Sequence, residues 1–345
     1  MDKLNPKPVY VQPCSSGCCV AACGILGVIA VSNLGRETVT VMPIPKFSGS
    51  ALGESYTIGK SEATFSVEFK FLEDMGYSGW MAFMGPPTCR RLLVADSGVG
   101  AVHIIDVVGR LHAGFVAAPG TLLGCRGVAA WGDLVAVSAW RDFHYSEHLI
   151  HVFEGSGTTW FPARRVVSCF GVRNRPTEEL WHPRGLRFTA DGSKMVIADQ
   201  SLNCVSTFRV KDGSFEGYAT KSVHSPCDVE EWEGGWLVTS QLNSAIYHVV
   251  DGEMGNLETT KSKLGRGGNE EGQFRMPSSL AWVPGVGLIV GELGVARLQM
   301  FATYDAIAMA GMSANRVGWM VAVARCALAR GRVAGGRARK SRKVA

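Results

Sequence analysis

The sequence lacks the short motifs that mark several large classes of enzyme. It has no G-x-S-x-G nucleophile elbow, no G-x-x-x-x-G-K-[ST] phosphate loop and no H-E-x-x-H zinc helix. These absences exclude the hydrolases, nucleotide-binding enzymes and metalloproteases that depend on those motifs. No coherent catalytic set remains, which favours a protein without enzymatic activity, and we expect no cofactor.

The ten cysteines lack the spacing of a zinc site or of a disulfide framework. The cysteines at positions 14, 18, 19 and 23 form a cluster without separated C-x₂-C pairs and without a partner histidine. We expect the cysteines to be small apolar residues inside strands. A reducing compartment is the simpler inference, so we expect a cytoplasmic protein and leave nuclear or secreted locations open.

A comfortable membrane span is also missing, and we expect no membrane partner. The apolar run at residues 18–31 is too short for one, although two lysines precede it in the order of a signal peptide. The same run repeats a later strand in register, since Ala30-Val31-Ser32 matches Ala136-Val137-Ser138. We therefore interpret residues 18–31 as strands.

The sequence does contain a complete β-sheet unit at residues 182–211. A Pro183-Arg184-Gly185 lead-in precedes an alternating strand, and Asp191-Gly192 supplies a hairpin turn. An apolar strand at 195–198 follows, and a third strand covers 204–210. Three strands joined by tight turns predict an antiparallel meander rather than a βαβ unit.

This unit recurs, and the residue that closes its apolar second strand marks each copy. These anchors are Ser32, Asp96, Ser138, Asp199, Ser240 and Glu292. About 48 residues per unit is typical of four-stranded propeller blades. Residues 64–71 and 165–170 are candidates for outer strands, and residues 8–13 are a candidate for the outer strand of the last blade. The carboxylate anchors recur in several units, which favours a structural role, accepting hydrogen bonds from turn amides, over catalysis.

The repeats resemble NHL repeats. The shared features are the Pro-x-Gly-aliphatic lead-in, the apolar strand ending in Ala-Asp, the aromatic end of the third strand (Phe208) and the connection at 265–277. The first copy departs by lacking the proline, and the third has Ser138 in place of Asp and a long insertion. The resemblance covers roughly residues 18–305 and implies an all-β, six-bladed β-propeller of the NHL/TolB-like kind. The expected domains are a segment at 1–13 with a ring-closing strand, the propeller at 14–312, and a basic short helix or tail at 313–345.

A polar loop in the third unit offers the first candidate site. Arg141, His144 and His148 are candidate binding residues there, and the two histidines could coordinate a metal together with Asp142 and Glu147. We interpret the loop as a polar hairpin insertion on one face of the disc, where propellers often build binding sites.

The second candidate is a pair of histidines, His182 and His224, which precede neighbouring first strands and are expected near the central channel. Peptidyl-hydroxyglycine lyases, which NHL repeats resemble, hold a metal there with three histidines. Here the equivalent positions are Met276 and either Gly124 or Cys125, so the third ligand is missing and no metal site is expected.

The C-terminal residues 325–345 hold eight basic residues and no acidic one, so the net charge of +5 is a property of the tail. The tail could bind nucleic acid or act as a nuclear address, but we interpret it first as solvated and disordered. We predict a monomeric, non-enzymatic interaction scaffold that binds a protein or peptide on a disc face. The alternative is a metal-dependent hydrolase or lyase acting in the central channel.

Overall fold

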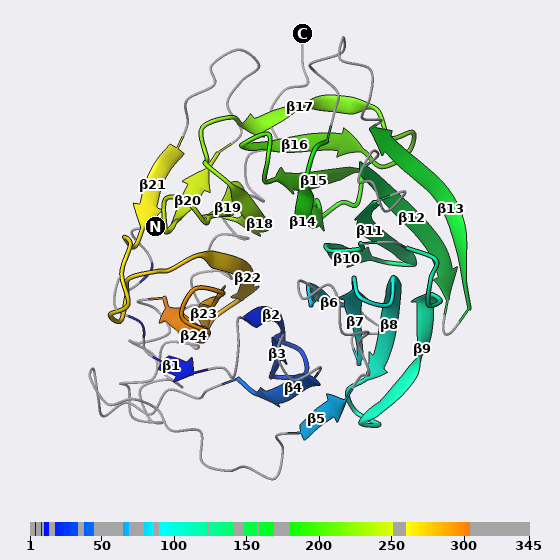
Figure 1. Cartoon of the computed structure of the whole chain (residues 1–345), viewed down its shortest axis with the longest axis horizontal. Helices are drawn as coiled ribbons and strands as arrows, with labels where there is room; N and C mark the ends of the chain where they lie inside the picture. The colour runs from blue at the N-terminus through cyan, green and yellow to red at the C-terminus, as the bar shows by residue number, and fades with distance from the viewer. Residues whose placement is uncertain are drawn as a thin grey trace, which may run out of the picture.

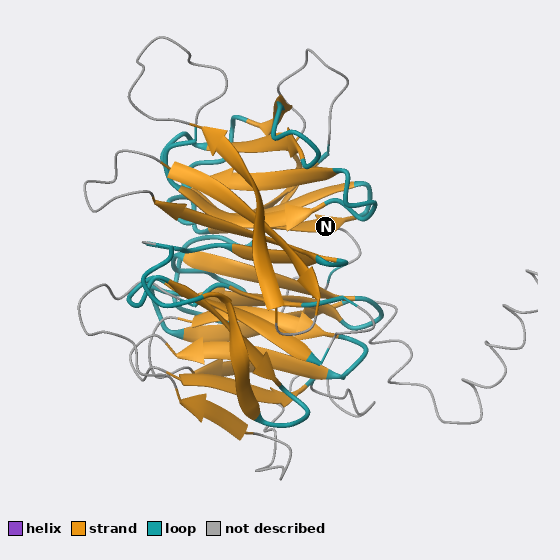
Figure 2. Cartoon of the chain, turned by 90° about the vertical axis from the view of Figure 1, so that its right-hand side faces the viewer, coloured by secondary structure: helices purple, strands orange, loops and turns teal. Residues whose placement is uncertain are grey.

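The protein is an all-β propeller, seen in a computed structural model. The structure describes Leu4, Pro8 and residues 10–13, 18–33, 38–44, 65–68, 79–85, 90–122, 124–140, 148–156, 159–168, 180–250 and 260–303. Within these residues the strands form six four-stranded antiparallel sheets. The sheets stand around a common centre (Figure 1) and together make a disc when viewed from the side (Figure 2). The described residues contain no helix, and so none able to cross a membrane.

Five sheets are each built from four consecutive strands. They are β2 (Cys18–Cys23), β3 (Val28–Asn33), β4 (Thr38–Pro43) and β5 (Phe65–Glu68); β6 (Met81–Phe83), β7 (Arg91–Asp96), β8 (Ala101–Asp106) and β9 (Leu111–Ala117); β10 (Val128–Trp131), β11 (Leu134–Trp140), β12 (His148–Ser156) and β13 (Thr159–Ser168); β14 (Pro183–Phe188), β15 (Lys194–Asp199), β16 (Cys204–Arg209) and β17 (Phe215–Thr220); and β18 (Pro226–Trp232), β19 (Gly235–Ser240), β20 (Ala245–Val249) and β21 (Thr260–Leu264).

The remaining sheet joins the two ends of the strand order. In it β22 (Pro277–Val283), β23 (Gly287–Glu292) and β24 (Arg297–Ala302) are completed by β1 (Tyr10–Pro13), which pairs antiparallel with β24. A strand from the beginning of the chain thus supplies the outer strand of the last sheet. This pairing covers the edge of β24, which would otherwise be open.

The first strands of the sheets form a closed inner ring. Each of β2, β6, β10, β14, β18 and β22 contacts the next, and β22 contacts β2. The strands of each sheet alternate in direction, so every first strand begins on the same face of the disc. We call this the upstream face; it also carries the turns between second and third strands. The opposite, downstream face carries the turns between first and second strands.

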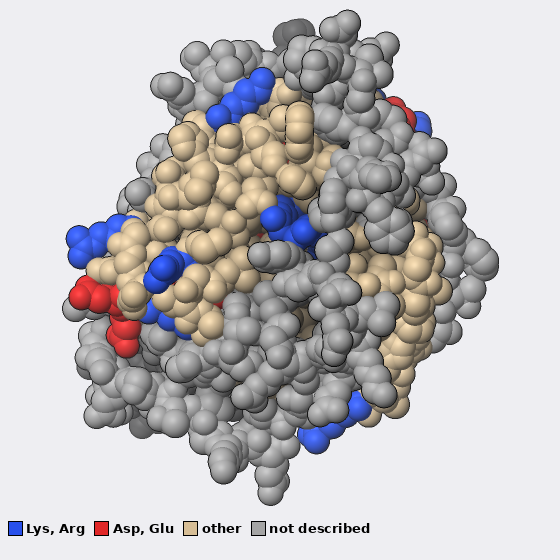
Figure 3. All heavy atoms as spheres, viewed as in Figure 1, with Lys and Arg blue, Asp and Glu red and all other residues tan. Residues whose placement is uncertain are grey.

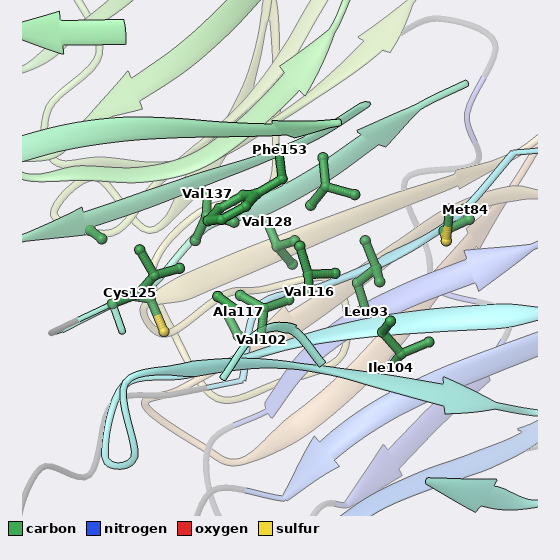
Figure 4. Packing of buried hydrophobic residues seen from close by; sticks show 14 residues of the cluster. Met84, Leu93, Val102, Ile104, Val116, Ala117, Cys125, Val128, Val137 and Phe153 are labelled. Carbon is green, nitrogen blue, oxygen red and sulfur yellow. The ribbon is translucent and has the colours of Figure 1, made fainter. Parts of the chain in front are cut away.

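The hydrophobic core lies between neighbouring sheets. Figure 4 shows one such layer, in which Leu93 and Ile104 of one sheet pack with Val128, Val137 and Phe153 of the next. Each second strand is covered by sheets on both sides, and β19 and β23 are buried along their whole length. Two-sided burial is the reason that second strands read as continuous apolar runs rather than as alternating ones.

The predicted structural role of the carboxylate anchors is confirmed. Asp96 Oδ1 accepts the amide of Val99 at 3.1 Å, and Glu292 Oε2 accepts the amide of Arg275 at 2.7 Å. Asp199 accepts three amides, those of Trp181 (2.5 Å), His182 (3.1 Å) and Leu202 (3.0 Å). Asp199 therefore joins the start of its first strand to the turn after its second strand, while Asp96 binds the turn and Glu292 binds the Arg275 amide just before the first strand.

The cysteines whose side chains are described are free thiols in buried positions. Cys19, Cys23, Cys204 and Cys227 lie within strands, as predicted, whereas Cys125 lies just before β10. The tail at 313–345 is outside the described residues.

Candidate functional site

The first strand of each sheet brings two residues to the propeller axis. Side chains two apart in a strand share a face, so Gly185 and Arg187 of β14 project together, as do Asp228 and Glu230 of β18. We name the two resulting rings the plug positions and the cavity positions. The plug positions are Cys19, Trp80, Gly127, Gly185, Asp228 and Ser279, and the cavity positions are Ala21, Ala82, Ala129, Arg187, Glu230 and Ala281.

The plug positions fasten neighbouring first strands to one another. The amide of Val20 donates to Ser279 Oγ at 2.9 Å, and the amide of Leu280 donates to Asp228 Oδ2 at 2.9 Å. Each of these bonds joins one sheet to the next, in a region where antiparallel pairing within a sheet cannot reach. Hydrogen bonds to side chains at plug positions therefore connect the first strands of neighbouring sheets, as backbone hydrogen bonds connect the strands within a sheet.

Trp80 occupies the upstream side of the axis. It is buried and packs with Cys19 and Cys227, and the Arg184 guanidinium lies 5.8 Å from the centre of its ring. This geometry is a cation–π contact. Burial raises the pKa of the Cys227 thiol to about 12, so this thiol stays protonated and unreactive at neutral pH.

The cavity positions surround a cavity of about 230 Å³, with Ala21, Ala82, Ala129 and Ala281 supplying most of the ring. All six described first strands contribute to its lining. Because an alanine side chain ends at Cβ, the space along the axis stays open where larger side chains would fill it. The cavity is smaller than sites for drug-sized molecules, and a single side-chain-sized group fits it better.

Arg187 and Glu230 are the charged members of this ring. Arg187 Nε donates to Glu230 Oε2 at 3.2 Å, and Arg187 Nη1 lies 3.6 Å from Asp228 Oδ1. The other Arg187 donors go to backbone carbonyls, Nη1 to Leu186 (3.0 Å) and Nη2 to Leu280 (3.3 Å). The guanidinium is thus committed to acceptors of the protein itself.

The carboxylates outnumber the cation at this point. Asp228 and Glu230 together carry two negative charges against the single positive charge of Arg187. Burial raises the pKa of Glu230 to about 7, with Asp228 adding to the shift and Arg187 opposing it. Burial also raises the pKa of Asp228. The site therefore carries a surplus negative charge only where both carboxylates are ionised, and Glu230 takes up a proton below about pH 7.

Three aromatic residues contribute to the lining beside the alanines: Phe83, Trp131 and Trp282. Phe83 and Trp282 also pack against the cores between sheets. Trp131 is partly exposed on the downstream face, and its Nε1 donates to the carbonyl of Ala190 at 3.1 Å. Gly192 makes room for this ring, because a Cβ atom there would lie 2.3 Å from it. The position of Trp131 is therefore fixed by its neighbours at the downstream end of the cavity.

The histidines predicted from the sequence lie elsewhere. The rings of His148 and His182 meet edge to face, with centroids 5.1 Å apart, and His182 Nδ1 lies 2.6 Å from Ser201 Oγ. His224 precedes β18, where its carbonyl accepts the Ser240 hydroxyl at 2.5 Å. Arg141 and His144 lie outside the described residues. None of the three described histidines lines the cavity.

The placement of His148 in an exposed loop is wrong. His148 is the first residue of β12 and is 2% exposed, because it pairs with Trp140 and Ser168 across its sheet. Burial lowers its pKa to about 4, and the nearby positive charges of His182 and Arg126 lower it further. His148 is therefore a neutral residue of the sheet at physiological pH.

The described residues contain no group of three side chains suited to holding a metal ion. The His148–His182 pair also has cationic neighbours, since Arg126 and Arg184 lower the pKa of His182 in addition to the effect of burial. A divalent cation would meet the same positive potential. Asp142, His144 and Glu147, the other members of the metal site considered in the loop, lie outside the described residues.

Among the described residues, large exposed apolar side chains lie on both faces of the disc: Ile25, Val108, Leu111 and Trp131 on the downstream face, and four others on the upstream face. Trp181 and Met276 stand just before β14 and β22, and Leu202 and Leu242 occupy turns between second and third strands; all four are well exposed, Leu242 at 75%. They belong to three consecutive sheets. We call these four residues the upstream apolar row.

The backbone around this row is held in an unusual conformation. Positive φ angles occur at Asn203 (54°), Ser244 (48°) and Ala296 (47°) in equivalent turns, and at Ser225 (50°) and Met276 (55°) before prolines. Such angles are costly for residues with a Cβ, so the surrounding contacts must enforce them. One of these contacts is the bond from the Ser225 amide to Asn203 Oδ1 at 2.7 Å.

Charge is distributed unevenly over the disc. On the face turned to the viewer in Figure 3, described Lys and Arg side chains lie near the middle as well as at the edge, and the clearest Asp and Glu side chains lie at the rim. Much of the described surface between them carries no charged side chain.

Comparison with known proteins adds little beyond the fold. No protein-family model matches the chain, and no curated protein matches it. Among solved structures, a chain from the "Crystal structure of Nidogen/Laminin Complex" is similar, with 12% identity, a TM-score of 0.49, and coverage of 68% of this chain and 76% of that one. The propeller assignment rests on the ring of sheets itself.

Proposed function

We propose that the chain is a six-bladed propeller of the NHL type that acts as a non-enzymatic interaction scaffold. It binds a protein or peptide on the upstream face and works as a monomer. The observation that supports this proposal is the upstream apolar row, which places Trp181, Leu202, Leu242 and Met276 on three consecutive sheets. Nucleic acid would reach only the basic tail.

The energetics of the row suit a docking surface. Full burial of an apolar side chain of this size contributes about 1.5–3 kcal/mol, and tryptophan is a frequent centre of binding energy at interfaces. The turns that carry the row are constrained by positive φ angles and by side-chain bonds to neighbouring sheets. A preformed surface loses little conformational entropy when a partner binds.

The alternative, a metal-dependent hydrolase or lyase in the channel, receives less support. It needs about three metal ligands at the axis, whereas the described axis carries alanines, an arginine and two carboxylates. The described histidines that approach each other are also flanked by arginines.

A peptide selection tests the scaffold proposal. A random peptide library is selected against the immobilised chain, and the dissociation constant of enriched peptides is measured by calorimetry. Leu242→Asp is expected to weaken binding by about tenfold or more, which corresponds to about 1.4 kcal/mol. The matched control is Ile25→Asp, another highly exposed apolar residue that lies in a turn on the downstream face.

Two results would contradict the proposal. One is that no peptide is enriched over an unrelated propeller surface. The other is that Leu242→Asp leaves binding unchanged while Ile25→Asp abolishes it, which would move the docking surface to the downstream face.

A further inference from the structure

The geometry points to a second binding site, separate from the upstream face: we propose that the axial cavity binds the ammonium group of a slender alkylamine, with Glu230 as its counter-ion. The amine is either a free small molecule or the side chain of a lysine in a polypeptide. The proposal does not depend on the docking function of the upstream face.

The shape of the cavity is the first argument. Four alanines leave a space of about 230 Å³ on the axis, which accommodates an unbranched alkyl chain but not a bulky ligand. Alanine and aromatic residues line this space together with Arg187, Glu230 and Thr189. A chain of methylene groups would thus replace water against alanine and aromatic carbon, which favours binding.

The charge of the cavity is the second argument. Arg187 directs its donors to Glu230 and to the carbonyls of Leu186 and Leu280, so it offers little to an incoming anion. Glu230 uses Oε2 for Arg187, and among the described residues Oε1 accepts no hydrogen bond. The site therefore has an unused carboxylate oxygen, which suits an ammonium donor.

The aromatic lining is the third argument. Trp131 lies two residues after the cavity position Ala129, on the same face of β10, and an aromatic ring attracts a cation to its face. The hydrogen bond from Trp131 to Ala190 fixes this ring before any ligand arrives. A carboxylate ligand would gain nothing from this ring and would meet Glu230.

Calorimetry with small probes tests the site in the intact chain. The probes are n-butylammonium chloride, sodium butyrate and 1-butanol, which share a chain length and differ in charge. We expect butylammonium to bind at least about tenfold more tightly than either of the others. Tighter binding of butyrate would overturn the proposal, since it would assign the cavity to anions through Arg187.

Substitutions locate the binding. Glu230→Gln keeps the shape of the side chain and is expected to weaken butylammonium binding by about tenfold or more. Glu231→Gln, on the next residue of β18 and exposed, is the matched control and should have no effect. If Glu230→Gln proves unstable, Ala82→Leu provides an independent test, because it fills the cavity without changing its charge.

The pH profile separates this site from nonspecific charge effects. The charged groups that face Glu230 are Arg187 and Asp228, with Glu231 further along the strand. An alkylammonium stays charged to about pH 10, so a change of binding near neutrality reports the carboxylates of the site and not the ligand. Binding should therefore tighten as the pH rises through about 7 and level off above it. A flat profile would contradict the assignment of Glu230 as the counter-ion.

A final comparison distinguishes the two sources of the ammonium group. Nα-acetyl-lysine amide carries the lysine side chain in a peptide setting and is compared with butylammonium. Tighter binding of the lysine derivative assigns the site to a polypeptide, and tighter binding of butylammonium assigns it to a free amine. Both results support an alkylammonium site, whereas binding of neither overturns it.

Discussion

Gly185 is the position where the packing of the inner ring is most easily tested. A Cβ atom added at this residue would lie 2.1 Å from Asp228 Oδ1 and 2.8 Å from Asp228 Cα, whereas ordinary contacts begin at 3.4 Å. The obstruction includes backbone, so a side-chain rotation cannot remove it. Gly185→Ala must therefore move β14 away from β18 or displace the Asp228 carboxylate from the Leu280 amide.

The expected cost follows from these two effects. Overpacking of a well-ordered core costs about 1–3 kcal/mol, and loss of a hydrogen bond to a buried charge costs about 1.5–3 kcal/mol. We expect Gly185→Ala to lower the free energy of unfolding by about 3–5 kcal/mol, a large part of the roughly 5–15 kcal/mol typical of a domain. Urea denaturation followed by tryptophan fluorescence measures this difference.

Gly24→Ala is the matched control for Gly185→Ala. Its added Cβ meets one side-chain atom, on Val283, at an ordinary 3.6 Å. It should change stability by less than about 0.5 kcal/mol. A loss below about 1 kcal/mol for Gly185→Ala would refute the argument that β14 and β18 approach too closely for a side chain.

Three further predictions concern buried polar groups. The folded chain holds a proton on Glu230 more tightly than the unfolded chain, because burial raises the pKa of this carboxyl to about 7. The protonated Glu230 therefore contributes to stability below about pH 4.5, and this contribution is lost as the pH rises through about 7. Glu230→Gln should remove this pH dependence, about 3 kcal/mol in the free energy of unfolding, as measured by urea denaturation across that range. Asp199→Ala leaves three amides without their acceptor and should cost about 2–4 kcal/mol in the same measurement, and an unchanged midpoint would contradict the capping role. Burial raises the pKa of the Cys125 and Cys227 thiols, so iodoacetamide at about pH 8 should label them only after unfolding, and mass spectrometry that finds them labelled in the native chain would contradict their burial.

The second and third strands could be predicted because two independent signals coincide there. Two-sided burial makes the second strand a continuous apolar run, and a tight turn places the third strand directly after it. The anchors Asp96, Asp199 and Glu292 mark the end of the second strand, and their amide contacts explain why a carboxylate recurs at that point.

The strands that escaped prediction lack such signals. β6 has only three residues, and Ser78 stands where three other units have a proline. β21 reads Thr-Lys-Ser-Lys-Leu, which is polar because an outer strand is covered on one side at most. The NHL resemblance stays a prediction, since it concerns ancestry and the sheets show architecture.

The axial cavity was missed for a chemical reason. His148 and His182 were candidate site residues because histidine side chains bind metals and act on substrates. A cavity is instead marked by small residues, and an alanine side chain has no functional group that would draw attention to it in a sequence. The signal was present in the repeats, because the residue after the first core aliphatic is Ala21, Ala82, Ala129 or Ala281 in four first strands and Arg187 or Glu230 in the other two.

The order of residues along the first strands separates the two proposed sites. Trp80, Cys19 and Cys227 form a buried cluster, and each precedes the cavity position of its own strand. This cluster therefore stands between the upstream face and the cavity, so a ligand at Glu230 enters from the downstream end, beside Trp131. A partner docked on the upstream apolar row does not reach the cavity.

The two sites can consequently be altered one at a time: Leu242→Asp should leave butylammonium binding intact, and Glu230→Gln should leave peptide binding intact. Loss of both activities in either variant would show that the buried cluster of Trp80, Cys19 and Cys227 transmits a structural change along the axis, and that the faces of the disc do not act independently.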